Sequence, residues 1–447
     1  MKHIHNFNKK LALLLVFVLG INITACGLKT TESTVSANVV YQSDNQIAQV
    51  QNVNLNDYSL VQVAMFSRHN IRAPLSGKGS LMEQVTPYPW AKWTADAGEL
   101  TTLGGAQEIA MGQYFEKYLV DKGLFMHNWM PKENQVRFYS NSFQRTIATA
   151  QYFSTGMLPA ANVDVEYHCN FGEMDPVFFP GLETCTKEQE MQYQADVDEL
   201  FGGRGLNGSI EEISDNIALI EEVVDFKDSK YAKENGITSI PLDDSKVVFE
   251  AGQEPKITGG FSIAASLADT LIMQYYEEAD DTKAGFGRKL TMEEWQKIAD
   301  VCSVSQTLKF GSKTLSKKFA NKLLKELKSE LNNSNRVFTY ICGHDSNVEP
   351  ILLSLGVEDY KATGNISSTT PIGCKIVFEK YINHDKKEFV KMYLVYQTSE
   401  KLRNNERVNL ENPPVWLELS LKGVQRNRDG FYSMDDVNKR FDEAIGQ

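Results

Sequence analysis

The stretch Leu60–Leu75 (LVQVAMFSRHNIRAPL) limits what this chain can fold into, because an apolar run ends there in a cluster of positive charge. Residues 60–66 are apolar except for one glutamine, which predicts a strand buried on both faces of a sheet. After it, His69 lies between Arg68 and Arg72, and two cations around an imidazole are unfavourable unless an anion binds there. Open α/β sheets place their ligands at the carboxyl ends of strands. The stretch predicts an anion-binding loop in an α/β fold; the alternative is a surface loop with solvated arginines and an incidental histidine.

Two later segments repeat the pattern of an apolar run that ends in polar residues and opens a helix. Residues 136–139 are followed by Arg145 at the start of a helical segment, and helix N-termini favour anions. Residues 337–342 are followed by His344 and Asp345, and the apolar positions after them have helical spacing. These repeats favour the functional interpretation of the first loop.

A long block of helical periodicity separates these segments. Between residues 187 and 331, apolar residues recur at three- and four-residue spacing, which predicts a series of helices. We therefore expect residues 57–186 and 332–447 to form one α/β domain. Residues 187–331 are expected to form a mostly helical cap domain inserted into it.

The motifs at the strand ends resemble those of the histidine acid phosphatases. RHxxRxP, a lone arginine in NSxQRT and a distal GHDSN occur in that family's order. Further stretches, such as ELTTLGG, EMDPVFFP, TPIGCKIVFE and DGFYSMDDV, are most similar to the periplasmic glucose-1-phosphatases, which are relatives of the bacterial phytases. The resemblance implies a phosphoglycerate-mutase-like α/β domain with an inserted, mostly helical cap. Two positions depart from the pattern: Asn70 stands where most members have glycine, and Phe179 where many have asparagine.

The resemblance also implies a role for each site residue. His69 is the expected nucleophile, forming a phosphohistidine, and Asp345 is the expected general acid. Four side chains are expected to bind the phosphate: Arg68, Arg72, Arg145 and His344. Glu254, in a QEP motif, corresponds to a glutamate that contacts substrate in the glucose-1-phosphatases; without the resemblance it would be a solvated loop carboxylate.

The expected reaction is hydrolysis of a small phosphate monoester, such as glucose 1-phosphate, at acidic pH. No step requires a metal or another cofactor, and no spacing of cysteine and histidine indicates a zinc site. Three alternatives remain. The chain could be a phytase, a silent lipoprotein that binds sugar phosphates, or a metal phosphohydrolase whose histidine–aspartate pair is His344–Asp345; that last class is all-helical and needs further ligands.

The first residues have the pattern of an export signal. Residues 1–25 combine three lysines with a short apolar run, and the sequence Ile23-Thr24-Ala25-Cys26 has the form of a lipobox. We expect a lipoprotein signal peptide, lipidation of Cys26 and a flexible tether over residues 26–56. This places the protein outside the cytoplasm, anchored at the bacterial cell envelope. The alternative is an ordinary signal peptide with an incidental cysteine.

The charge of the chain excludes some classes of partner. The formal net charge is −12, and removing the three lysines of residues 1–25 changes it to −15. Such a chain is not expected to bind nucleic acid or anionic lipid surfaces. The oligomeric state is left open by the sequence.

Five cysteines follow Cys26, so an odd number remains to pair in an oxidising compartment. Cys342 and Cys374 lie in apolar runs, where a free cysteine packs as a small hydrophobe. Cys169 and Cys185 flank one loop and form the one disulfide that we expect.

Overall fold

The computed structural model describes residues 57–77 and 79–446. All of them belong to one compact unit, Ile47–Gln447. The expected signal peptide at residues 1–25, the lipidated Cys26 and the tether at residues 26–56 lie outside the described residues. Within the part of the chain that the structure describes, no helix combines the length and the apolar character needed to cross a membrane.

A mixed sheet of eight strands carries the site. Its order is β10-β8-β7-β1-β6-β2-β3, with β9 paired to β8, and β1, β6, β2 and β3 run parallel. The strands are β1 Tyr58–Arg68, β2 Val136–Ser140, β3 Val165–Glu166, β6 Phe338–Gly343, β7 Lys375–Asn383, β8 Glu388–Tyr396, β9 Val415–Glu418 and β10 Tyr432–Ser433. The α/β prediction is confirmed, and the three apolar runs that the motifs follow are the neighbouring strands β1, β6 and β2.

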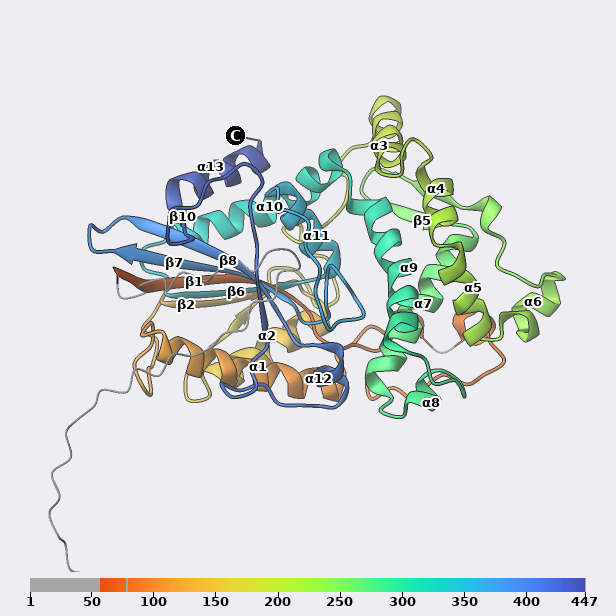
Figure 1. Ribbon diagram of the computed structural model, residues 1–447, viewed down its shortest axis with the longest axis horizontal. Helices are drawn as coiled ribbons and strands as arrows, with labels where there is room; N and C mark the ends of the chain where they lie inside the picture. The colour runs from red at the N-terminus through yellow and green to blue at the C-terminus, as the bar shows by residue number, and fades with distance from the viewer. Residues whose placement is uncertain (1–56, 78, 447) are drawn as a thin grey trace, which may run out of the picture. The chain divides into compact units, whose positions relative to one another are not determined.

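Side chains along β1 point alternately to the two faces of the sheet, and both faces are covered by helices. Val63 and Met65 pack on one face of the sheet with α1 Thr102–Asp121 and α2 Gln144–Met157. Ala64 and Phe66 pack on the other face with α10 Lys313–Leu331, α11 Asp345–Ser354 and α13 Met434–Ile445. Figure 1 shows α10 and α13 above the sheet and α1 and α2 below it. A strand buried on both faces is mostly apolar, as residues 60–66 of β1 are apart from Gln62.

Strand register brings the three motif loops to one edge. Arg68 at the end of β1 pairs with Gly343 at the end of β6. Ser140 at the end of β2 pairs with Cys342, one residue before the end of β6. Backbone bonds continue the pairing beyond the strands, since His69 N donates to Gly343 O at 2.9 Å and Asn141 N donates to Cys342 O at 3.0 Å. The residues that follow β1, β6 and β2 therefore lie next to one another at the same edge of the sheet.

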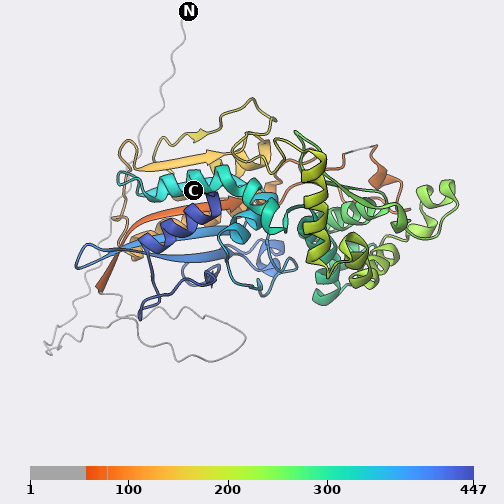
Figure 2. The same cartoon turned by 90° about the horizontal axis from the view of Figure 1, so that it is seen from above.

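A second group of helices lies beside the sheet rather than over its faces (Figure 1, Figure 2). They are α3 Lys187–Leu200, α4 Gly205–Glu212, α5 Ser214–Val223, α6 Lys230–Asn235, α7 Gly260–Glu277, α8 Asp281–Ala284 and α9 Met292–Phe310, with the hairpin β4 Lys246–Val248 and β5 Lys256–Thr258. Their apolar cluster also includes Met82 and Val85 from the connection between β1 and α1. One short helix remains, α12 Ser399–Arg403, together with the 3-10 turns Leu81–Glu83, Phe226–Asp228 and Leu242–Asp244.

One helix of the expected cap insertion packs elsewhere. α10, within residues 187–331, places Leu323 and Leu327 in the apolar cluster of the sheet, with β1, α11 and α13. The boundaries of the two expected domains remain a prediction.

The expected disulfide between Cys169 and Cys185 is wrong. All five cysteines of the described residues are free thiols. The Cys185 thiol lies 3.7 Å from Phe249 O and packs against the apolar cluster of the helices beside the sheet. Cys169 instead lies beside the β2–α2 loop, where its backbone N–H donates to Ser142 Oγ at 3.2 Å. Flanking one loop in sequence did not bring the two sulfurs together.

Candidate active site

His69 lies at the carboxyl end of β1 and is held from both sides by backbone bonds. Its N–H donates to Gly343 O at 2.9 Å, and its carbonyl accepts from Gly373 N at 3.2 Å. Its Nδ1 lies 2.8 Å from Asn70 O, and because a carbonyl oxygen only accepts, Nδ1 carries the proton. The lone pair of Nε2 is thereby left for a nucleophilic role.

The surroundings of His69 keep it uncharged. Burial contributes most, followed by the charge of Arg145, and together with His344, Arg68 and Arg72 they hold the pKa of His69 well below its usual value. His69 as a whole is 3% exposed. A neutral imidazole with a free Nε2 among arginines is suited to attack an anion that those arginines bind.

Asn70, the departure from glycine, ties this loop to a buried ion pair. Its Nδ2 donates to Glu108 Oε1 at 2.7 Å, and its Oδ1 accepts from Ile71 N at 2.8 Å. Glu108 of α1 pairs with Lys375 of β7 at 3.1 Å, and both side chains are fully buried. Gly373 is needed here, because it has a φ of +67° and a Cβ on it would come 2.7 Å from Asn70 Nδ2. The amide of Asn70 thus anchors the carbonyl that fixes the His69 tautomer.

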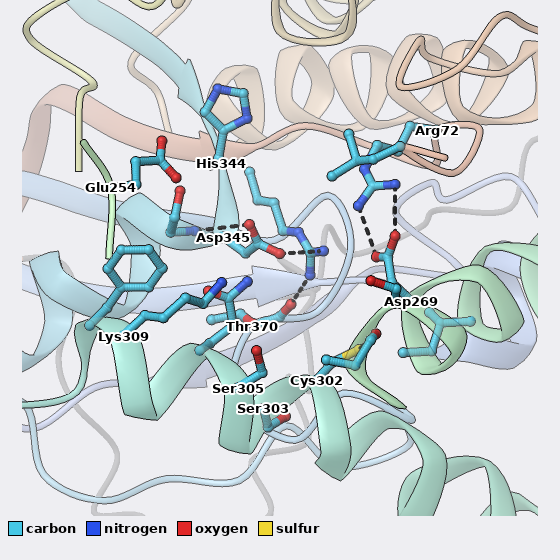
Figure 3. Close-up of a pocket in the computed structure, with 18 of the residues that line it drawn as sticks. Arg72, Glu254, Asp269, Cys302, Ser303, Ser305, Lys309, His344, Asp345 and Thr370 are labelled. Atoms are coloured by element: carbon cyan, nitrogen blue, oxygen red, sulfur yellow. Dashed lines mark hydrogen bonds and ion pairs between the residues drawn. The ribbon is translucent and has the colours of Figure 1, made fainter. Parts of the chain in front are cut away.

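The arginines of the loop are already paired with carboxylates. Arg68 Nη2 lies 2.9 Å from Asp345 Oδ2, and its Nη1 donates to Thr370 O. Arg72 makes two bonds to Asp269 of α7, at 2.8 and 3.2 Å (Figure 3). Asp269 has no motif around it in the sequence, so only the fold reveals that this helix supplies a carboxylate to the site.

Arg145, the second residue of α2, is the least satisfied of the three arginines. Its Nη1 lies 3.4 Å from Gly98 O, and its Nε is buried without a partner among the described residues. Burial and the neighbouring charge of Arg72 lower the pKa of Arg145 to about 10. A partly buried cation with spare donors favours binding of an anion.

Asp345 begins α11 and rests as a carboxylate. Burial favours its neutral form, but the positive charges of Arg68 and then Arg72 outweigh burial and hold the pKa of Asp345 well below its usual value. The ion pair with Arg68 is the contact through which this arginine lowers the pKa of Asp345. A general-acid role for Asp345 therefore requires that substrate first weaken its contact with the arginines.

These side chains share a cavity of about 730 Å³. His69, Asp345 and the three arginines lie in its wall together with Glu254, which precedes β5, and Lys309 of α9. Figure 3 shows Glu254 and Lys309 on one side of Asp345 and Asp269 on the other. Burial raises the pKa of Glu254. Phe179, the second departure from the family pattern, also lines this cavity.

The structure therefore brings together the seven expected site residues that it describes. Their roles remain a prediction, because geometry places side chains without showing a reaction. Among the described residues, no cluster of three or more histidine, cysteine, aspartate or glutamate side chains could hold a metal ion. The expectation that the reaction needs no metal stays a prediction.

Comparison with known proteins gives one family and one fold. The family model described as Histidine phosphatase superfamily (branch 2) matches residues 59–196 and 268–395. Glucose-1-phosphatase of Providencia rettgeri is 33% identical over 397 residues, which cover 88% of this chain and 93% of that protein. Phytase AppA of Escherichia coli (strain K12) is 25% identical over 409 residues, covering 87% of this chain and 92% of that protein. The structure of the apo phytase of Hafnia alvei superposes with a TM-score of 0.79 at 22% identity, over 87% of this chain and 97% of that one.

Proposed function

The chain belongs to the histidine phosphatase superfamily (branch 2), and from that premise we propose that it hydrolyses sugar phosphates of the glucose 1-phosphate type. It is a phosphoric monoester hydrolase, as its family and its relatives are. The observation that carries the proposal is the arrangement around His69: a neutral imidazole with a free Nε2, facing three arginines in one cavity. A silent binding protein would need neither this nucleophile nor the carboxylate beside it.

In the first proposed step, the arginines and His344 hold the three non-bridging oxygens of the phosphoryl group. His69 Nε2 then attacks phosphorus, the bond from phosphorus to the sugar oxygen breaks, and a phosphohistidine forms. Asp345 gives its proton to the departing sugar oxygen. In the second step, Asp345 accepts a proton from water, and that water attacks the phosphohistidine to release inorganic phosphate.

The resting ion pair explains how Asp345 could acquire the proton. In the free site Arg68 holds it as a carboxylate at 2.9 Å. A bound phosphate dianion neutralises Arg68 and Arg72 and brings negative charge close to Asp345, and both effects raise its pKa. Proton uptake on substrate binding is easiest at acidic pH, which fits an acid optimum.

Glu254 is the proposed limit on substrate charge. It lies in the wall of the cavity that holds His69, and a carboxylate there repels a leaving group that carries further phosphates. A sugar monophosphate presents its single phosphate group to the arginines and a neutral sugar to Glu254. Identity also favours this choice, since the glucose-1-phosphatase is 33% identical and the phytase 25%. Inositol phosphate hydrolysis is the alternative.

A substrate panel tests the proposal. The chain should hydrolyse glucose 1-phosphate faster than inositol hexakisphosphate, in excess chelator, and Glu254→Gln should raise the activity on inositol hexakisphosphate relative to glucose 1-phosphate. Glu250→Gln is the matched control, because Glu250 lies four residues earlier, half exposed and paired with Lys256 at 2.8 Å. The control should leave the ratio unchanged. Faster turnover of inositol hexakisphosphate by the unaltered chain would favour the phytase alternative, and no turnover of either substrate would favour a binding protein.

The location of the enzyme is part of the proposal. The residue pattern before Cys26 supports export and lipid anchoring at the bacterial cell envelope, with the catalytic part of the chain tethered through residues 26–56. Such an enzyme would act on phosphate esters outside the cytoplasm.

A further inference from the structure

Asn141, the first residue after β2, is fully buried and has only one possible amide orientation. Its Oδ1 accepts two backbone N–H groups, from Ser142 at 2.8 Å and from Asp175 at 3.0 Å. Turning the amide over would set its NH₂ group against both donors. Nδ2 must therefore point the other way, where it lies 3.0 Å from Met174 Sδ and 2.7 Å from His344 Nε2.

This orientation determines which nitrogen of His344 carries a proton. Because Asn141 Nδ2 is a donor, His344 Nε2 must accept, and the proton of the neutral ring lies on Nδ1. The imidazolium form is excluded by the same contact, since its Nε2–H would face the amide N–H. Burial and then the charge of Arg145 also hold the pKa of His344 well below its usual value.

The other groups around His344 do not reverse this preference. Arg145 comes from α2, Arg68 from the end of β1, and His69 and Arg72 from the loop after it. Positive charge on any of them opposes an imidazolium. Asp345, the next residue, is the group that favours one, and it is already paired with Arg68. The rings of His344 and Phe143 are nearly perpendicular, with centroids 5.8 Å apart, and this contact adds no charge.

A consequence appears on the pocket side of the ring. Arg145 Nη2 lies 3.3 Å from His344 Nδ1. If Nδ1 carries a proton, both groups are donors and cannot bond to each other. Two partly buried donors that face each other at this distance are each satisfied by one shared acceptor placed beside them.

We propose that Asn141 is a positioning residue, which holds His344 as the neutral Nδ1–H tautomer so that His344 and Arg145 donate to the same oxygen of a bound phosphate. The phosphate half of this inference rests on the proposed function, whereas the tautomer does not. Asn141 itself touches no reacting atom. Its effect is exerted through the ring of His344.

The tautomer is measured directly by ¹⁵N NMR of the full chain labelled at histidine. The His344 signals are assigned by their loss in His344→Gln and, independently of any variant, by through-space contact with Phe143. In the unaltered chain, Nε2 should resonate as an unprotonated nitrogen and Nδ1 as a protonated one, down to acidic pH. A protonated Nε2 would overturn the inference.

Inorganic phosphate tests the second half. Adding it should shift the His344 Nδ1–H signal towards a stronger hydrogen bond, and an Nδ1–H that does not respond while phosphate inhibits the enzyme would overturn the shared-oxygen arrangement. If glucose 1-phosphate is not hydrolysed while Nε2 is unprotonated, the proposed function fails and the tautomer stands. The two failures are therefore distinguishable.

A pair of matched variants separates positioning from structure. Asn141→Asp replaces the donor by an acceptor, so His344 Nε2 should become protonated and the pH profile of kcat/KM should gain an ionisation. Asn347→Asp is the control: this equally buried amide accepts from the backbone N–H of His344 at 3.0 Å and does not touch its ring. It should leave the tautomer as it is. The same spectral change in both variants, or in neither, would contradict the proposal.

Discussion

At the scale of single residues, Asp345 rests in a state that differs from its proposed role. Its carboxylate is ionised beside Arg68, whereas a general acid must hold a proton when the leaving group departs. The demand for that proton depends on the leaving group. A sugar alkoxide needs it, and p-nitrophenolate leaves readily without it.

Asp345→Asn should therefore cost far more on glucose 1-phosphate than on p-nitrophenyl phosphate. The substitution keeps the shape and removes the proton, and general acid catalysis contributes about 10²–10⁴-fold. Measuring kcat on both substrates with the folded variant decides it. Equal losses on the two substrates would assign Asp345 to orienting phosphate or water, and the acid would have to be sought elsewhere.

The sequence indicated some site residues and not others, for a physical reason. Arg68, His69 and Asp345 follow buried strands, and parallel strand ends meet at one edge, so their proximity could be predicted from local patterns. Asp269 lies on a helix whose sequence has no polar motif, and its contact with Arg72 depends on how α7 packs. The amide orientation of Asn141 depends in part on the backbone N–H of Asp175, which lies in another loop. Neither is encoded in spacing along the chain.

At the scale of elements, the loop that carries His69 packs against an ion pair between α1 and β7. Glu108 and Lys375 are fully buried, 3.1 Å apart, and Lys375 Nζ also donates to Gly373 O at 3.0 Å and Ser67 Oγ at 3.2 Å. Breaking a buried pair from one side leaves an uncompensated charge, whereas replacing both partners by neutral groups is often tolerated.

Glu108→Gln should destabilise the fold by about 3–5 kcal/mol, because Lys375 keeps its charge and loses its partner. Adding Lys375→Met should recover much of this loss. The free energy of unfolding in urea, measured for both single variants and the double variant, gives the coupling directly. Additive losses would show that the two charges do not depend on each other.

Strands of the sheet could be predicted from the sequence, whereas the packing of one helix could not. The runs 60–66 and 136–139 were expected as strands and lie within β1 and β2, and the run 337–342 overlaps β6, which begins one residue later. Strands buried on both faces need a mostly apolar sequence, which is why these three could be predicted. α10 was expected within the cap insertion, yet it covers the sheet. Its apolar stripe predicts a helix with one buried face but does not identify the surface against which that face packs.

At the scale of the whole molecule, Glu349 makes stability depend on pH. It lies on α11, is partly buried, and accepts from Thr307 Oγ1 of α9 at 3.2 Å. Burial raises the pKa of Glu349 from 4.5 to about 7. Between about pH 4.5 and about pH 7, the folded form therefore binds more protons than the unfolded form. Stability falls as the pH rises through this range, and the loss is complete above about pH 7.

Glu349→Gln cannot ionise and should avoid this loss. Its Tm should exceed that of the unaltered chain by more at about pH 8 than at about pH 5. Thermal unfolding of both proteins at the two pH values checks it. A difference in Tm that is the same at both would mean that Glu349 ionises in the folded protein as it does in the unfolded one.

Anchoring also belongs to the whole molecule. If Cys26 carries the lipid, Cys26→Ser should move the protein from the membrane fraction to the soluble extract without changing its specific activity, because Cys26 precedes the described residues that build the site. Fractionation followed by an activity assay measures both quantities. Sedimentation of the variant with membranes would contradict the lipobox interpretation.

The central claim is that His69 forms a covalent bond to phosphorus. Its Nε2 is free because Nδ1 is engaged by Asn70 O at 2.8 Å, so the label from a ³²P-labelled substrate should be trapped on His69 after quenching in alkali, which preserves phosphohistidine. Peptide mapping of the quenched protein identifies the labelled residue, and His69→Ala should carry no label and show no hydrolysis. Label on a serine, an aspartate or another histidine would contradict the account.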